Sequence, residues 1–216
     1  NSDILINCEI VILAVKPQTL NSVCAEIKYY ISKKNLIVSI VAGINLANIY
    51  KWLDGKQKII RAMPNTPMLV KQGVVGLFAN ELVSAKEKAI ITLILSKISS
   101  CFWLEKEDAI DAITAISGSG PAYFLMLMEI MTETAIQIGI DEKMAKDITI
   151  KTALGASIMA NNSDKNSKQL RIDITSKKGT TEAAINYLEK QKFRDIMTQA
   201  IKMALKRAKE LQKEIR

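Results

Sequence analysis

Short, continuous apolar runs alternate with amphipathic stretches through the first half of the chain. The runs are typical of buried strands and lie at 9–15, 36–41, 58–62, 74–79 and 101–104. The stretches repeat their apolar residues every three or four positions and predict helices at 20–31, 46–53 and 85–98. Because strands alternate with helices, the pattern predicts an α/β fold with a doubly wound parallel sheet.

Beyond residue 105 the strand-like runs stop and every periodic segment is helical. Helices are predicted at 107–116, 120–139, 142–160, 180–189 and 193–214. A polar break at 161–167 separates the third of these from the fourth. We therefore expect two domains with a boundary near residue 105, an α/β domain over 1–105 and an all-α domain over 106–216.

The segment 124–138 is apolar on almost every side, and it follows the sequence SGSGP at 117–121. A helix that is apolar all round is expected to be buried. The two glycines predict a tight turn at its start, where free backbone N–H groups at the positive helix end would suit a small polar ligand. The alternative is a helix cap with close helix packing.

The composition is that of an ordinary globular protein, with 49% hydrophobic and 24% charged residues. No uninterrupted apolar run reaches the roughly 18 residues of a membrane span, and the first residues lack the basic region of a signal peptide. The chain does not begin with Met, so we expect further residues upstream. The cysteines lie far apart without a C-x-x-C pair, which favours a reducing cytoplasm.

The chain contains no histidine, which excludes Ser-His and Cys-His nucleophile pairs and most zinc sites. We therefore expect no metal. The net charge is +8, and Lys and Arg concentrate at 190–216. Apolar residues recur there at helical spacing and aromatic residues are nearly absent. We interpret this segment as an amphipathic helix with a solvated basic face rather than as a nucleic-acid-binding surface.

Three of the predicted strands end in distinctive turns, AVKP at 14–17, VAG at 41–43 and R-x-MPNTP at 61–67. Ligands of open α/β sheets bind beyond the carboxyl ends of the strands, so we expect a shared crevice there. The alternative is that each turn only ends its strand. No G-x-G-x-x-G follows a strand in these residues, so they do not contain the phosphate-binding turn of a dinucleotide fold.

A second polar turn, at 173–184, leads into the predicted helix at 180–189. Thr180 or Thr181 is expected to be the N-cap, and Glu182 favours the first turn through the helix dipole. Free N–H groups and hydroxyls at this position suit a small carboxylate. An ordinary helix cap is the alternative.

Five motifs in order make the chain similar to one protein family. AVKP (14–17), VAG (41–43), R-x-MPNTP (61–67), SGSGPAY (117–123) and TS-x-x-GTTEAA (175–184) resemble those of the pyrroline-5-carboxylate reductases. The resemblance runs over the whole chain. It implies a partial Rossmann-type parallel sheet that binds a dinucleotide, followed by a helical domain that binds substrate and interlocks with a partner subunit. It also implies reduction of 1-pyrroline-5-carboxylate, a cyclic imine, to L-proline by hydride from NADPH or NADH, the last step of proline biosynthesis.

The same resemblance implies the site residues. Those at the cofactor would be Asn1, Val15, Lys16, Ala42 and Asp173. Those at the substrate would be Ser176, Gly179, Thr180, Thr181 and, placed by spacing alone, Glu107. Thr181 would be catalytic, and the SGSGP segment would form the pocket floor near the nicotinamide. The implied partner is a second copy of the chain, in a homodimer or a larger homo-oligomer in the cytoplasm, without nucleic acid or membrane.

Two departures from the family pattern leave alternatives open. On the order of fifty residues with a glycine-rich phosphate turn usually precede the position of Asn1, and without them we expect no activity. The usual substrate turn Ser-Pro-Gly-Gly is here the sequence SKKG at 176–179. The first departure allows a non-catalytic helical dimerisation fragment, and the second allows a related imine or β-hydroxyacid reductase.

Overall fold

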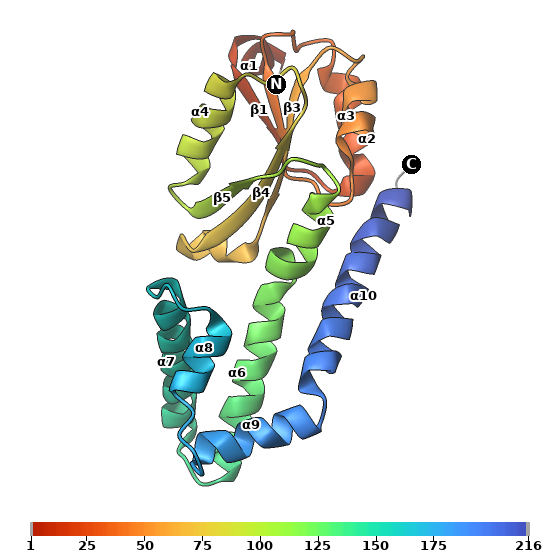
Figure 1. Cartoon of the computed structure of the whole chain (residues 1–216). Coiled ribbons are helices and arrows are strands. Elements are labelled where there is room, and N and C mark those ends of the chain that lie inside the picture. Colours follow the sequence, from red (N-terminus) through yellow and green to blue (C-terminus); the bar gives the residue numbers. More distant parts are fainter. Residues whose placement is uncertain (1, 215–216) are drawn as a thin grey trace. The chain divides into compact units, whose positions relative to one another are not determined.

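The chain divides into two units in the computed structural model, which describes residues 2–214 (Figure 1). The sheet unit contains the described residues up to Pro121 and those from Ile201 onward, and the helical unit contains 122–200. The elements up to residue 118 are α1 (Ser2–Asn7), β1 (Ile10–Leu13), η1 (Pro17–Thr19), α2 (Leu20–Ile27), β2 (Leu36–Ser39), α3 (Leu46–Trp52), β3 (Lys58–Pro64), η2 (Thr66–Val70), β4 (Gly73–Ala79), α4 (Ala85–Leu95), β5 (Ser99–Trp103), α5 (Ala109–Ile113) and η3 (Thr114–Gly118). The later elements are α6 (Gly120–Gln137), α7 (Glu142–Asn161), α8 (Ser167–Asp173), α9 (Thr180–Lys190) and α10 (Phe193–Glu214).

The sheet has the strand order β1-β2-β3-β4-β5 and is mostly, but not entirely, parallel. The strands β1, β2 and β3 run parallel to one another, β4 runs antiparallel to β3, and β5 runs parallel to β4. The prediction of a uniformly parallel sheet is therefore wrong at β4. Only residues 65–72 connect β3 to β4, whereas a parallel connection needs a crossover of a dozen or more residues.

Neighbouring residues on the central strands enter two separate cores on the two faces of the sheet. Ile37 and Ile59 join the core under α2 and α3, whereas Val38 and Ile60 join the core that contains Ile91 of α4. Figure 1 shows α2 and α3 on one side of the sheet and α4 on the other. Since successive strand residues point to opposite faces, a continuous apolar run is what a strand covered on both faces requires.

The helix starts follow local capping signals. The side chain of Ser84 accepts a hydrogen bond from the backbone N–H of Glu87 at the start of α4, and Asp141 does the same for Met144 at the start of α7. Asn166 caps α8, a helix that the sequence pattern did not predict. We also did not predict α1. Both helices are short, so their apolar residues repeat too few times to set a period.

The apolar helix α6 is exposed in the single chain, so the expectation that it is buried is wrong at this level. Phe124 is 65% exposed, Leu125 63% and Met126 62%. The pattern indicates only that a helix must be covered. It does not say whether the covering atoms come from the same chain.

Counting uninterrupted apolar runs missed one segment that meets the length and composition of a membrane span. By length and composition alone, the helix 109–137 is long and apolar enough to cross a membrane. Glu129 and Glu133 interrupt its apolar run, which is why counting uninterrupted residues missed it. A single such helix is weak support for a membrane span, because helices of other proteins meet the same criterion.

Candidate functional site

The turns after β1 and β2 leave the same edge of the sheet, as predicted. Leu13 and Ser39, the last residues of the two strands, are paired in register, and the N–H of Ile40 donates to the carbonyl of Leu13 at 3.0 Å. Since the strands are parallel, the segments 14–17 and 41–43 both begin at their carboxyl ends. This is the edge at which open α/β sheets bind ligands.

Three of the predicted cofactor residues lie in these turns. Val15 and Lys16 are exposed, and Ala42 is half-buried. Lys16 is extended, and Pro17 then starts η1, because proline has a fixed φ and needs no donor at a helix start. Asn1, the fourth predicted residue of this group, lies outside the described residues.

The turn after β3 is joined to the SGSGP segment by one side chain. The amide nitrogen of Asn65 donates to the carbonyl of Ser117 at 3.0 Å, and its oxygen accepts from the N–H of Val74 at 2.8 Å. A Cβ on Gly118 would lie 3.5 Å from Cε of Met63. Two motifs that are more than fifty positions apart in the sequence therefore share this edge of the sheet.

The SGSGP segment is not the free helix start that the sequence predicted. Ser117 and Gly118 lie in the π-helical segment η3, which directly follows α5. The N–H of Ser119 donates to the carbonyl of Thr114 at 2.9 Å, so this group is not free for a ligand. A π-helical turn interrupts an α-helix without ending it, and such turns are frequent at functional sites.

Glu107 has partners within the sheet unit. Its Oε1 atom accepts a hydrogen bond from Arg61 at 2.8 Å and another from the N–H of Leu46, the first residue of α3, at 2.7 Å. The side chain of Arg61 is almost fully buried and requires a carboxylate partner. These contacts give Glu107 a structural role, whereas its contact with substrate stays a prediction.

Asp111 lies beside this pair and completes a buried polar cluster. Its Oδ1 atom lies 4.0 Å from Arg61 Nη2 and accepts a hydrogen bond from Gln212 of α10 at 2.6 Å. Burial raises the pKa of the Asp111 carboxyl above its ordinary value, although Arg61 and Gln212 act to lower it. The last turn of α10 is thereby attached to the sheet unit.

Asp173, in the helical unit, has partners on both carboxylate oxygens. Lys165 donates to Oδ2 at 2.7 Å and Gln169 donates to Oδ1 at 2.8 Å. These two hydrogen bonds lower the pKa of the Asp173 carboxyl. Asp173 ends α8 and is exposed, and its approach to the cofactor stays a prediction.

The predicted substrate turn forms the start of α9, but its N-cap differs from the prediction. Gly179 is the N-cap, and Thr180 and Thr181 are the first two helical residues. The N–H of Gly179 donates to the carbonyl of Ser176 at 3.0 Å, and Glu182 accepts from the N–H of Lys178 at 2.7 Å. A glycine cap has no side chain, so the first N–H groups of α9 gain no capping partner from it.

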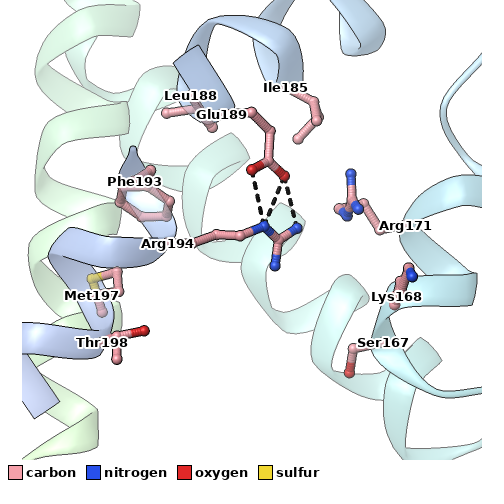
Figure 2. Close-up of a pocket in the computed structure, with 10 residues that line it drawn as sticks. All are labelled: Ser167, Lys168, Arg171, Ile185, Leu188, Glu189, Phe193, Arg194, Met197 and Thr198. Carbon is pink, nitrogen blue, oxygen red and sulfur yellow. Dashed lines mark hydrogen bonds and ion pairs between the residues drawn. The ribbon is translucent and has the colours of Figure 1, made fainter. Parts of the chain in front are cut away.

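A cleft of about 800 Å³ in the helical unit was not predicted from the sequence. It lies among α8, α9 and α10 and contains a bidentate ion pair in which Arg194 donates to Glu189 at 2.7 to 2.9 Å (Figure 2). It is lined by Ser167, Lys168, Arg171, Ile185, Leu188, Glu189, Phe193, Arg194, Met197 and Thr198. None of the predicted site residues lines it. The only signal in the sequence was the amphipathic pattern of α9 and α10, which cannot tell a cleft from a packed face.

Family models match both parts of the chain. Residues 107–211 match the model described as pyrroline-5-carboxylate reductase dimerisation, and residues 1–43 match the model of NADP oxidoreductase, coenzyme F420-dependent. The pyrroline-5-carboxylate reductase of Pseudomonas aeruginosa is 40% identical over 215 residues, which are 100% of this chain and 79% of that protein.

Solved structures agree with this match. A pyrroline-5-carboxylate reductase from Coxiella burnetii superposes with a TM-score of 0.89 at 41% identity over 95% of this chain and 77% of that one. The pyrroline carboxylate reductase of Plasmodium falciparum, solved with NADP bound, has a TM-score of 0.90 at 30% identity over 98% of this chain and 80% of its own. With this degree of identity over nearly all of its residues, the chain belongs to the pyrroline-5-carboxylate reductase family.

Proposed function

We propose that the protein carrying this chain reduces 1-pyrroline-5-carboxylate to L-proline with NADPH or NADH. Pyrroline-5-carboxylate reductases make proline from this imine with a nicotinamide cofactor. The observation that carries the proposal is the 40% identity to the Pseudomonas enzyme along the whole chain. The absence of histidine does not conflict with it, because a protonated cyclic imine already accepts hydride and mainly needs to be positioned.

The turns at the carboxyl edge of the sheet fit a nicotinamide dinucleotide. Val15 and Lys16 are accessible there, and the small side chain of Ala42 leaves room for a ligand to approach the backbone. These three residues would hold the cofactor together with Asn1, and Asp173 would approach it from α8. When bound, the cofactor supplies the hydride, and the protein supplies its position.

The start of α9 fits the carboxylate of the substrate. The positive end of the helix dipole and the N–H groups of Thr180 and Thr181 favour an anion at this position. The hydroxyl of Thr181 would accept a hydrogen bond from the protonated ring nitrogen, and Ser176 and Gly179 would shape the turn around the carboxylate. Glu107 would contribute by holding the side chain of Arg61 and the first residue of α3 in place through its hydrogen bonds.

The protein would act as a homodimer in the cytoplasm. The dimerisation family model starts at residue 107, close to the proposed boundary between a dinucleotide-binding domain at 1–105 and a helical domain at 106–216. The exposed apolar side chains of α6 supply a surface that a second copy can cover. We favour a second copy over lipid as the cover, because Glu129 and Glu133 lie within the same helix.

A kinetic comparison at Thr181 tests the proposed function. The purified protein is mixed with NADPH and the imine, and oxidation of NADPH is followed at its absorbance band. Thr181→Ala should lower kcat/KM by about 100-fold, as loss of a hydrogen bond to the reacting group does elsewhere. Thr181→Ser keeps the hydroxyl and should retain most of the activity. A wild-type protein that oxidises NADPH only with another imine or with a β-hydroxyacid substrate would contradict the proposal.

A further inference from the structure

The side chain of Asn65, which is not among the predicted site residues, connects three segments of the sheet unit. Asn65 directly follows β3, at the carboxyl edge of the sheet. Its amide nitrogen donates to the carbonyl of Ser117 in η3 at 3.0 Å, and its oxygen accepts from the N–H of Val74 in β4 at 2.8 Å. A single carboxamide therefore fixes the π-helical segment relative to two strands.

The segment that Asn65 holds lies close against the sheet. A Cβ on Gly76 of β4 would come within 3.0 Å of Ile113 Cγ2, so no side chain fits between β4 and the end of α5. A Cβ on Gly118 would be in ordinary van der Waals contact with Met63 of β3, 3.5 Å from its Cε atom. Packing sets the distance between this helix and the sheet, but apolar contacts are not directional and do not fix its rotation or register. A hydrogen bond to the carbonyl of Ser117 does, because it has a required direction.

We propose that Asn65 is a positioning residue for the reduction. By holding the carbonyl of Ser117, it sets where the backbone of η3 stands at the carboxyl edge, beside the turns proposed to hold the cofactor. This inference rests on the proposed function, since it assigns Asn65 to the same reaction. Asn65 itself touches neither substrate nor cofactor in this assignment and acts through η3.

The chain offers a matched control at the opposite end of the same strand pair. The amide nitrogen of Asn80 donates to the carbonyl of Gln57 at 2.9 Å, and its oxygen accepts from the N–H of Ile59 at 3.1 Å. Asn80 therefore makes the same two kinds of bond as Asn65. Because it contacts the first residues of β3, it lies at the edge of the sheet opposite the carboxyl end of that strand.

The experiment compares Asn65→Asp with Asn80→Asp. Each aspartate keeps the acceptor and loses the donor. Both variants should lose similar thermal stability, but only Asn65→Asp should lower kcat, by about 10- to 100-fold, while the Kd of NADPH changes less than about threefold. Amide hydrogen exchange at Ser119 should accelerate in Asn65→Asp and not in Asn80→Asp. If either aspartate prevents folding, Asn65→Ser and Asn80→Ser, which add no charge, replace the pair.

The outcomes separate this inference from the proposed function. An active wild-type protein in which both variants lose the same fraction of kcat would overturn the role of Asn65 alone. The same holds if exchange at Ser119 is unchanged in Asn65→Asp. A folded wild-type protein that does not reduce the imine would overturn the proposed function, and the role of Asn65 in it as well.

Discussion

At the scale of single residues, the turn before α9 is under backbone strain. Lys178 has a φ of 62°, in the left-handed region that favours glycine. The family pattern noted above has glycine at this position. The turn therefore keeps a glycine-like conformation with a lysine in place, and its shape is maintained by the hydrogen bond from the N–H of Lys178 to Glu182. The altered sequence at 176–179 therefore still forms a turn into α9.

We expect Lys178→Gly to raise the free energy of unfolding by about 0.5–1 kcal/mol, because relief of the left-handed strain exceeds the added entropy of the unfolded chain. Lys177→Gly removes the same charge from the neighbouring position, where φ is not positive. It should therefore leave stability unchanged or lower it. Urea unfolding of the two variants measures both effects. Equal stability changes in the two variants would show that the strain is not significant.

At the scale of elements, the direction of a strand and the exposure of a helix depend on the connections and contacts of each element. The strand β4 has the apolar pattern of a buried strand, but its short connection makes it antiparallel to β3. The helix α6 has the pattern of a buried helix, but its apolar side chains are exposed in one chain. In both elements the local pattern correctly predicted the type of element. What it packs against was decided by other parts of the protein.

Because apolar side chains of α6 are exposed, we predict that a single charged residue introduced among them weakens self-association. Leu125→Glu should raise the dimer dissociation constant at least about tenfold, because it places a charge in an interface that excludes water. Leu93→Glu on α4 is the matched control, since Leu93 and Leu125 are each 63% exposed. Sedimentation velocity over a range of concentrations measures association. A protein in which both variants remain equally dimeric would place the interface elsewhere than on α6.

At the scale of the whole molecule, buried polar contacts join segments that are distant in the sequence. The hydrogen bond from Gln212 to Asp111 spans 101 positions and attaches the end of α10 to the sheet unit. Arg61 brings Glu107 and Asp111 into the same cluster. Since a buried polar group without a partner is costly, each member of the cluster depends on the others.

Gln212→Ala should lower the free energy of unfolding by about 1–2 kcal/mol at neutral pH, because it leaves a buried carboxylate oxygen without its donor. The pKa of Asp111 is already raised in the folded state, and losing a donor raises it further. Ionisation of this carboxyl therefore lowers folding stability at neutral pH. The loss becomes smaller as the pH falls toward 3.8, the ordinary pKa of an aspartate carboxyl. The deficit of Gln212→Ala should shrink over the same range.

Gln169→Ala is the control for this variant. Gln169 donates to Asp173 at 2.8 Å in a similar amide–carboxylate pair, but this pair is on the surface. We expect it to cost less than about 0.5 kcal/mol, because water replaces the lost donor. Chemical unfolding of both variants at several pH values is the measurement. A deficit in Gln212→Ala that grows as the pH falls would contradict the assignment.

Much of the candidate site could be anticipated from its residues. The turns that contain Val15, Lys16 and Ala42 share one edge, and Thr180 and Thr181 do start a helix. Other features could not be anticipated. Nothing near Ser117 in the sequence indicates a π-helical turn, or the hydrogen bond that the Ser117 carbonyl accepts from Asn65, 52 positions away. The partners of Glu107 were likewise invisible, since Arg61 and Leu46 lie far from it in the chain.

The sequence by itself determined the type and approximate bounds of most elements, the division into a sheet-forming and a helical half, and the family motifs. These properties depend on residues within a few positions of one another, through periodicity, capping and turn conformation. Only the tertiary structure decided the π-helical form of η3, the exposure of α6 and the partners of Arg61 and Asn65. Those properties depend on contacts between distant segments, and a local sequence pattern does not indicate which distant segment will pack against an element.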